Sequence, residues 1–175
     1  MKFIKPQNIV AQMGLKTGQT VADFGSGSGF YALSAAQMVG NTGQVLAVDV
    51  QKSKLTATFS AGSQQGLKNI KVIQADLDKP IDNAIDVTSC DAVILASVLH
   101  EVKHRDMLLQ NAYKVLKTGG LVLAVEWKAE HTIFGPSLEK RIPEDQLEQE
   151  LASIGLHKVK SIPADMYHYA LVFSK

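Results

Sequence analysis

Short apolar runs alternate with amphipathic stretches along most of the chain. The apolar positions of five runs follow one another almost without polar interruption, which is typical of strands covered on both faces of a parallel sheet. These runs lie at residues 20–24, 44–50, 70–76, 91–97 and 121–127. The amphipathic stretches predict helices at 29–39, 52–65, 105–117 and 143–154, each closed by a glycine within two residues. Strand followed by helix, five times over, predicts an α/β, doubly wound, Rossmann-like sheet.

Both ends of the chain depart from this alternation. At the front we expect an N-terminal helical segment within 1–14, with the helix itself at 6–13 over the first strand. At the other end, the extended runs 157–164 and 166–175 have no helix between them and therefore predict an antiparallel hairpin. We expect seven strands, mostly parallel with an antiparallel C-terminal strand, in a single domain of residues 1–175.

Composition limits the class of protein. A chain of 175 residues with 46% apolar content can bury one core, and a net charge of +1 favours neither nucleic acid nor an anionic membrane as partner. The apolar runs are far shorter than the ~20 residues of a membrane span. The start MKFIKPQN has no leader-like pattern, so we expect a cytoplasmic protein. The single cysteine, Cys90, excludes an internal disulfide, and we expect no metal site.

A glycine-rich turn follows the first strand in VADFGSGSGF. Gly25, Gly27 and Gly29 let the backbone pass close to a ligand, and the helix that follows offers free amides. A dinucleotide fingerprint needs a third small residue where this sequence has Phe30. An adenosine-containing ligand without phosphates therefore fits better than a dinucleotide. Taken alone, the motif is equally consistent with a tight turn that binds nothing.

Two acids stand at further strand ends. Asp49 closes the second strand, 24 residues beyond Gly25, where it can accept hydrogen bonds from both hydroxyls of a ribose. Asp76 follows the third strand and is a candidate acceptor for an exocyclic amine. Ligands of open α/β sheets lie beyond the carboxyl ends of the strands. Together with the glycine turn, the two acids predict a nucleoside site.

From about Leu15 onward, five segments resemble the class I S-adenosylmethionine-dependent methyltransferases. They are VADFGSGSG (21–29), AVDV (47–50), QADL (74–77), DAVILASVLHEV (91–102) and KVLKTGGLVLAVEW (114–127). Within that class, VLHEV and LKTGGLVLAVEW resemble the branch of the quinone-biosynthesis and arsenite methyltransferases. Arsenite chemistry needs several thiols, whereas Cys90 stands alone at the amino end of the fourth strand. The quinone enzymes are longer than this chain. The resemblance to this branch therefore places the chain near it and does not assign either activity.

The resemblance implies S-adenosylmethionine as cofactor and assigns a set of residues to it. These are Asp23, Gly25, Ser26, Gly27, Gly29, Asp49, Val50, Asp76, Leu77 and Ser97. Asp23 and the glycine turn would hold the methionine end, completed by backbone near Ser97. Asp49 would hold the ribose, and the residue after it would cover one face of the adenine. Asp76 and the next amide would bind the adenine edge.

Methyl displacement from a sulfonium requires alignment and a nucleophile freed of its proton. His100 and Glu101 follow the fourth strand and are the candidate catalytic bases. Two plainer roles compete with this one: His100 would orient a neighbouring loop, and Glu101 would pair with Lys103 or Arg105 as a solvated charge.

Three candidate substrate residues lie near the end of the chain. Trp127 closes the fifth strand and would form an acceptor wall or pack in the core. The segment 128–143 lacks strong periodicity and is the expected lid; its Arg141 would bind an acidic substrate or be a surface charge. Tyr167 would be a cation–π partner of a sulfonium or a packing residue of its strand.

We therefore expect an S-adenosylmethionine-dependent methyltransferase that acts on an unidentified small-molecule acceptor by direct in-line displacement. One alternative is a non-catalytic module that binds the cofactor and acts through a partner, or through a second copy in a homodimer. A second is an NAD(P)-dependent oxidoreductase, which Phe30 and the terminal hairpin disfavour. An aminopropyl transferase ranks lower, because no cluster of acids is spaced for a polyamine.

Overall fold

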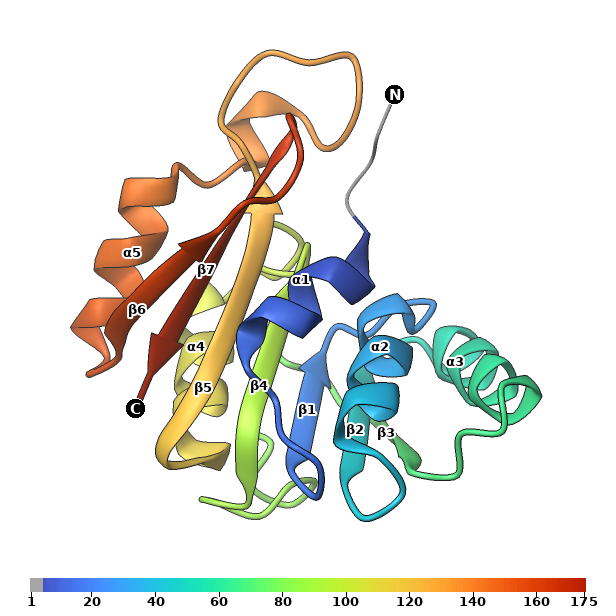
Figure 1. The fold of residues 1–175 in the computed structure, drawn as a ribbon. Coiled ribbons are helices and arrows are strands. Elements are labelled where there is room, and N and C mark those ends of the chain that lie inside the picture. Colours follow the sequence, from blue (N-terminus) through green and yellow to red (C-terminus); the bar gives the residue numbers. More distant parts are fainter. Residues whose placement is uncertain (1–4) are drawn as a thin grey trace.

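In the computed structural model, which describes residues 5–175, a seven-stranded sheet is covered by helices on both faces (Figure 1). The first four residues of the expected N-terminal segment lie outside the described residues. The strands are β1 (Thr20–Phe24), β2 (Gln44–Asp49), β3 (Ile70–Gln74), β4 (Cys90–Ala96), β5 (Leu116–Trp127), β6 (His157–Ile162) and β7 (His168–Ser174). The helices are α1 (Pro6–Met13), α2 (Phe30–Val39), α3 (Lys52–Gln64), α4 (Arg105–Val115) and α5 (Glu144–Ser153), with a short 3₁₀ turn η1 (Leu138–Lys140).

The strand order is β3-β2-β1-β4-β5-β7-β6. The first five strands are parallel, and β7 runs antiparallel to both β5 and β6. This confirms the predicted fold class, including the antiparallel C-terminal strand. The hairpin of β6 and β7 inserts its second strand beside β5, so the last strand of the chain lies inside the sheet and β6 forms its edge.

Each face of the sheet buries its own apolar cluster. On one face, Val10 of α1, Ala36 of α2 and Val125 of β5 belong to the same cluster. On the other face, Leu108 of α4 and Leu151 of α5 share the second cluster. Figure 1 shows α1 and α2 in front of the sheet, with α4 behind it. Continuous apolar strands are therefore explained by burial on both sides.

The alternation of strand and helix, expected five times, occurs four times, and one predicted boundary was wrong. No helix joins β3 to β4: residues 75–89 form turns, because Pro80 and the surrounding Asp and Asn residues favour turns over a helix, while Ile81 and Ile85 still reach the core. The helix predicted at 105–117 ends at Val115, and β5 begins at once, five residues earlier than predicted. An irregularity in the β4–β5 pairing and the positive φ of Gly119 accommodate this early start.

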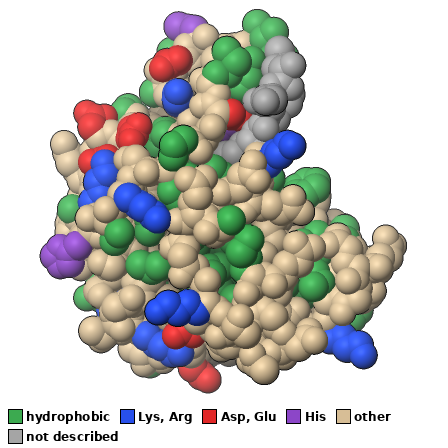
Figure 2. Space-filling view, in the orientation of Figure 1, with side chains coloured by type: hydrophobic (Ala, Val, Ile, Leu, Met, Phe, Trp, Pro, Cys, Tyr) green, Lys and Arg blue, Asp and Glu red, His purple; other side chains and the backbone are tan. Residues whose placement is uncertain are grey.

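The parallel arrangement brings the carboxyl ends of β1, β2 and β4 to one edge of the sheet. At this edge α1 contacts α2, and the segment 128–143 forms the loop above the ends of β5 and β7 (Figure 1). No helix within residues 5–175 has the length and apolar character needed to span a membrane. On the face in Figure 2, basic and acidic side chains are scattered among each other.

Candidate active site

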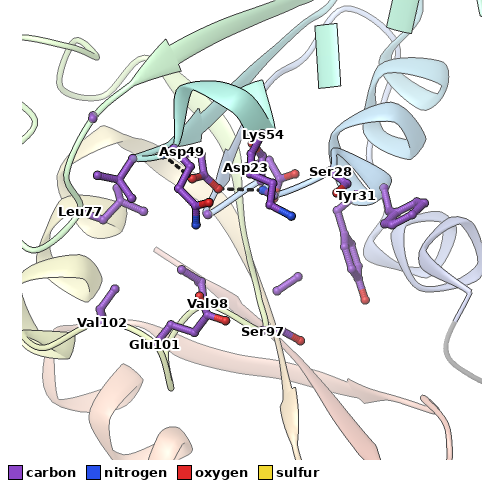
Figure 3. A pocket seen from close by; sticks show the side chains of 18 of the residues that line it. Asp23, Ser28, Tyr31, Asp49, Lys54, Leu77, Ser97, Val98, Glu101 and Val102 are labelled. Carbon is purple, nitrogen blue, oxygen red and sulfur yellow. Dashed lines mark hydrogen bonds between the residues drawn. The ribbon is translucent and has the colours of Figure 1, made fainter. Parts of the chain in front are cut away.

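A cavity of about 720 Å³ opens at the carboxyl ends of β1, β2 and β4 (Figure 3). The structure brings together nine of the ten residues assigned to the cofactor, all but Gly29, in its wall. They are Asp23, Gly25, Ser26, Gly27, Asp49, Val50, Asp76, Leu77 and Ser97. Segments separated by some seventy residues of sequence thus face one space, as expected for a ligand site at the strand ends of an open sheet.

The three glycines of the turn have different structural roles. A Cβ on Gly25 would lie 2.3 Å from Val98 Cγ2, and one on Gly29 would lie 2.6 Å from Thr58 Cγ2. These two glycines are therefore required by close packing of the protein on itself. Gly27 also has a positive φ, yet no atom lies closer than 4.0 Å to the place of its Cβ. Of the three, Gly27 is the one whose missing side chain leaves open space at the cavity.

Asp49 joins the glycine turn to the end of β2. Its Oδ2 accepts a hydrogen bond from the Gly27 amide at 2.9 Å, and its Oδ1 accepts one from the Gln51 amide at 2.8 Å. The residue is only 8% exposed. Each carboxylate oxygen can accept more than one hydrogen bond, so both retain capacity for the hydroxyls of a ribose.

Asp23 is a buried carboxyl group with an unsatisfied oxygen. The residue is 1% exposed, and its Oδ2 has no hydrogen-bond partner among the described residues. Burial, opposed by a backbone hydrogen bond from Ala32 and assisted by the charge of Asp49, raises the pKa of this carboxyl to about 7. An unsatisfied buried polar atom is costly unless a ligand completes it. Because it lines the cavity, Asp23 is suited to a cationic group of a bound molecule.

The adenine end of the predicted site is more open. Asp76 pairs with Lys79 Nζ at 2.9 Å and accepts a hydrogen bond from the Asp78 amide at 3.1 Å. The hydrogen bond from Lys79, followed by that of the amide, holds the pKa of Asp76 below its usual value. Val50 is 58% exposed although it lines the cavity. An exposed apolar side chain in a ligand site suits the face of a planar ring.

Charge in the cavity wall is strongly one-sided. The wall contains a single basic side chain among the described residues, Lys54, and five acids, namely Asp23, Asp49, Asp76, Asp78 and Glu101. Such a wall repels a pyrophosphate and attracts a cation. This distribution disfavours the dinucleotide alternative on grounds independent of Phe30.

Ser97 holds a strained backbone conformation where β4 enters the cavity. Its φ is 54°, one of two positive values among the described non-glycine residues, and its amide donates to the Val125 carbonyl at 2.8 Å. A serine in this region is uncommon and is kept only where surrounding contacts hold it. The bond to β5 supplies such a contact.

The two candidate bases are placed differently. Glu101 lines the cavity with a side chain that is 70% exposed, whereas His100 is not part of the wall and its side chain is 7% exposed. His100 Nδ1 lies 2.7 Å from Glu126 Oε2. Arg105, an expected partner of Glu101, instead forms two hydrogen bonds of 2.6 Å with Glu150.

None of the three expected substrate residues lines the cavity. Trp127 packs against the ring of His168 at 4.1 Å and that of Tyr167 at 6.5 Å. The Arg141 guanidinium lies 5.4 Å from the Trp127 ring and is 7% exposed as a residue. Its five N–H groups donate within the loop, to the carbonyl oxygens of Lys128, Glu130, Phe134 and Pro136 and to Thr132 Oγ1. Arg141 thus organises the segment 128–143 and has no donor left for a substrate.

Sequence reasoning missed several residues of the wall, notably Pro6, Tyr31, Lys54, Val98 and Val102. Tyr31 stands in the first turn of α2, immediately after the glycine turn, which was the available signal. Burial, and next the carboxylate of Asp23, raises its pKa well above the usual range. Figure 3 shows its long side chain reaching from α2 along the cavity. The inward direction of Val98 and Val102 depends on the loop after β4, whose shape no periodicity predicts.

Comparison with known proteins extends these observations. A family model described as a methyltransferase domain matches residues 15–167. The ubiquinone/menaquinone biosynthesis C-methyltransferase UbiE of Pseudomonas entomophila is 34% identical over 117 residues, which are 65% of this chain and 44% of that protein. The chain therefore spans less than half the length of this relative.

Two solved structures share the fold. A SAM-dependent methyltransferase from Aquifex aeolicus superposes with a TM-score of 0.88 at 26% identity, covering 98% of this chain and 89% of that one. An arsenic(III) S-adenosylmethionine methyltransferase from Chlamydomonas reinhardtii gives a TM-score of 0.70 at 21% identity, covering 99% and 73%, and this is a likeness of fold alone. The resemblance seen in the sequence is confirmed, and the chain belongs to the methyltransferase domain family.

Proposed function

We propose that this chain transfers the methyl group of S-adenosylmethionine to a small-molecule acceptor by direct in-line displacement. The observation that carries the proposal is the unsatisfied, buried Oδ2 of Asp23 in a predominantly acidic cavity. When bound, S-adenosylmethionine supplies a methyl group activated by a sulfonium cation. It also carries an ammonium group and no phosphate, which matches the charge of the wall.

The residues present fit each part of this cofactor. Asp23 would accept from the ammonium group, and Asp49, held by the Gly27 amide, would accept from the ribose hydroxyls. Val50 and Leu77 would enclose the adenine, and Asp76 would accept from its amine. These contacts would fix the cofactor at three points and so align its methyl group with an acceptor.

The size of the cavity lies in the range of small-molecule sites and suits the cofactor, and we propose that the acceptor is also a small molecule. The matched UbiE protein is named a C-methyltransferase, which makes a carbon acceptor one candidate here. We further propose that residues 1–175 act as one domain, that the segment 128–143 is a lid beside the acceptor, and that the protein works in the cytoplasm without nucleic acid. A homodimer would be needed only if a second copy completes the acceptor wall.

The proposal is tested by incubating the protein with S-adenosylmethionine labelled with ¹³C in the methyl group and with a cell extract depleted of macromolecules. New labelled products should appear by mass spectrometry, and should be absent with the Asp23→Asn variant. Tight cofactor binding without any labelled product would favour the non-catalytic module. Absence of cofactor binding would overturn the proposal.

A further inference from the structure

Thr58 is a buried threonine of α3 whose hydroxyl group bonds outside its own helix. The residue has 0% exposure and lies on the buried face of α3. A helical threonine commonly donates its hydroxyl to the carbonyl four residues earlier, as Thr56 does to Lys52 at 3.0 Å. Thr58 Oγ1 instead donates to the Gly27 carbonyl at 3.0 Å, 31 residues away in sequence. This bond connects α3 to the glycine turn of the cavity.

Hydrogen bonds, and not packing, fix the backbone at Gly27. A Cβ on Gly25 or Gly29 would collide with a neighbouring side chain, whereas no atom lies closer than 4.0 Å to the Cβ position of Gly27. A glycine in open space can adopt many backbone conformations. The Gly27 amide donates to Asp49 Oδ2 at 2.9 Å, and the bond from Thr58 is the one that its carbonyl accepts within residues 5–175. The two peptide planes that flank the Gly27 Cα are therefore each held by one side chain.

From this geometry we propose that Thr58 is a positioning residue for the cofactor, which aims the Asp49 carboxylate at the ribose by holding Gly27. The inference rests on the proposed function and adds a residue that the cavity wall does not contain. The hydroxyl of Thr58 fixes the Gly27 carbonyl, and the fixed backbone directs the Gly27 amide at Oδ2 of Asp49. The amide then occupies one lone pair of this oxygen, and the other remains for a ribose hydroxyl.

The methyl group of Thr58 has a separate structural role. A Cβ on Gly29 would lie 2.6 Å from Thr58 Cγ2, so the methyl group packs where Gly29 has no side chain. Substitution can separate the two roles, because valine keeps a methyl group and loses the donor, whereas serine keeps the donor and loses the methyl group. Stability depends on the methyl group, and ribose recognition depends on the hydroxyl.

The test compares two ligands by calorimetry: S-adenosylhomocysteine and its counterpart that lacks both ribose hydroxyls. Thr58→Val should raise the Kd of S-adenosylhomocysteine about fivefold, as expected for the loss of one neutral hydrogen bond, and should leave the Kd of the counterpart unchanged. The ratio of the two Kd values should therefore fall about fivefold. Thr58→Ser should keep the wild-type ratio. A role in stability alone would not change this ratio.

Thr56→Val is the matched control. Thr56 belongs to the same helix and also donates its hydroxyl to a backbone carbonyl, but it is exposed and bonds only within α3. This variant should keep the wild-type ratio of Kd values. If Thr58→Val does not fold, Thr58→Ser and Thr58→Ala provide the same comparison, because both lack the methyl group and only serine has a donor. Serine should then keep the ratio and alanine should lower it.

A second readout follows the Gly27 amide in the protein without ligand. Its hydrogen exchange, measured by NMR, should be about fivefold faster in Thr58→Val and unchanged in Thr58→Ser and Thr56→Val. The inference is overturned by an unchanged Kd of S-adenosylhomocysteine in Thr58→Val, by an equal loss for both ligands, or by unchanged exchange of Gly27. A serine variant that discriminates as poorly as the valine variant would also overturn it. Absent binding of S-adenosylhomocysteine to the wild type is a different result, because it contradicts the proposed function itself.

Discussion

The amide of Gly27 donates a 2.9 Å hydrogen bond to Oδ2 of Asp49, which ties the turn after β1 to the acid that closes β2. This bond directly links Gly27, the glycine that leaves open space at the cavity, to the expected acceptor of the ribose hydroxyls. The same carboxylate accepts from the Gln51 amide, just before α3 begins. A change at Asp49 should therefore affect both the ribose and the turn beneath the ligand.

Asp49→Ala should weaken S-adenosylmethionine binding by about 2–4 kcal/mol, or roughly 30- to 1,000-fold in Kd, because charged acceptors of two hydroxyls are removed. Asp91→Ala is the matched control. Asp91 also accepts a 2.8 Å bond from a backbone amide, that of Thr20, but at the opposite end of the strands. Calorimetry should show lost affinity only for Asp49→Ala, while both variants lose stability. Equal affinity in the two would refute the ribose assignment.

Burial of Asp23 predicts a pH-dependent stability. The folded pKa of about 7 exceeds the ordinary 3.8, so the folded state binds more protons between these values. The stabilising contribution is fully present below pH 3.8 and is lost as the pH rises through 7, a change on the order of 4 kcal/mol. Urea denaturation at pH 5 and pH 8 should show this fall, and Asp23→Asn should reduce it strongly. Equal pH dependence in the variant would contradict the buried-acid account.

The same group predicts how cofactor affinity varies with pH. An ammonium ion binds the ionised form of Asp23, whose population rises about tenfold between pH 6 and pH 8 for a pKa of about 7. The affinity for S-adenosylhomocysteine should therefore increase by up to about tenfold over this range. In Asp23→Asn the affinity should be weaker and nearly independent of pH. A wild-type affinity that is flat with pH would exclude Asp23 as the ammonium acceptor.

Gly25 and Gly66 have the same φ of +72° but different surroundings. Alanine at Gly66 meets no atom within 4 Å, so it should cost only the backbone strain of about 1–2 kcal/mol. Alanine at Gly25 adds a collision with Val98, whose neighbours line the cavity, and should cost more stability together with cofactor binding. Thermal unfolding with and without S-adenosylhomocysteine compares the two variants. Equal losses of stability would mean that Val98 moves aside without cost.

We expect substitution of Arg141 to loosen the loop that it organises while leaving cofactor affinity unchanged. Lysine cannot reproduce five donors in a fixed plane, so Arg141→Lys should speed amide hydrogen exchange in the segment 128–137. Cofactor affinity should stay within about twofold, because this loop does not line the cavity. Lys140→Ala is the exposed control and should leave exchange unaltered. Slower methyl transfer with an unchanged loop would instead restore Arg141 as a substrate residue.

The sheet could be predicted because strands that are buried on both faces have apolar residues at consecutive positions. The strand TVADF and its parallel neighbours are mostly apolar, and the motifs at their ends predict the cofactor site. The distinction among three glycines could not be predicted, because it depends on contacts with Val98 and Thr58 that are distant in sequence. The same holds for Glu126, whose partner is 26 residues away and meets it only across two adjacent strands.

The acceptor side was the least predictable region. Trp127, Arg141 and Tyr167 are residue types common in binding sites, yet here Arg141 turns inward and Trp127 packs against the hairpin. Whether an arginine faces a substrate or its own loop depends on tertiary geometry that the local sequence does not contain. A single acid within an apolar strand, as in LVLAVEW, was the available signal for the buried pair of Glu126 and His100.

The central claim is that the cavity binds S-adenosylmethionine. Its most direct test is calorimetric titration of the wild-type chain with S-adenosylmethionine, S-adenosylhomocysteine and NADH in parallel. The account predicts that the first two bind with one-to-one stoichiometry and that NADH does not, because an acidic wall repels its pyrophosphate. Binding of NADH without the other two would contradict the account and restore the oxidoreductase alternative.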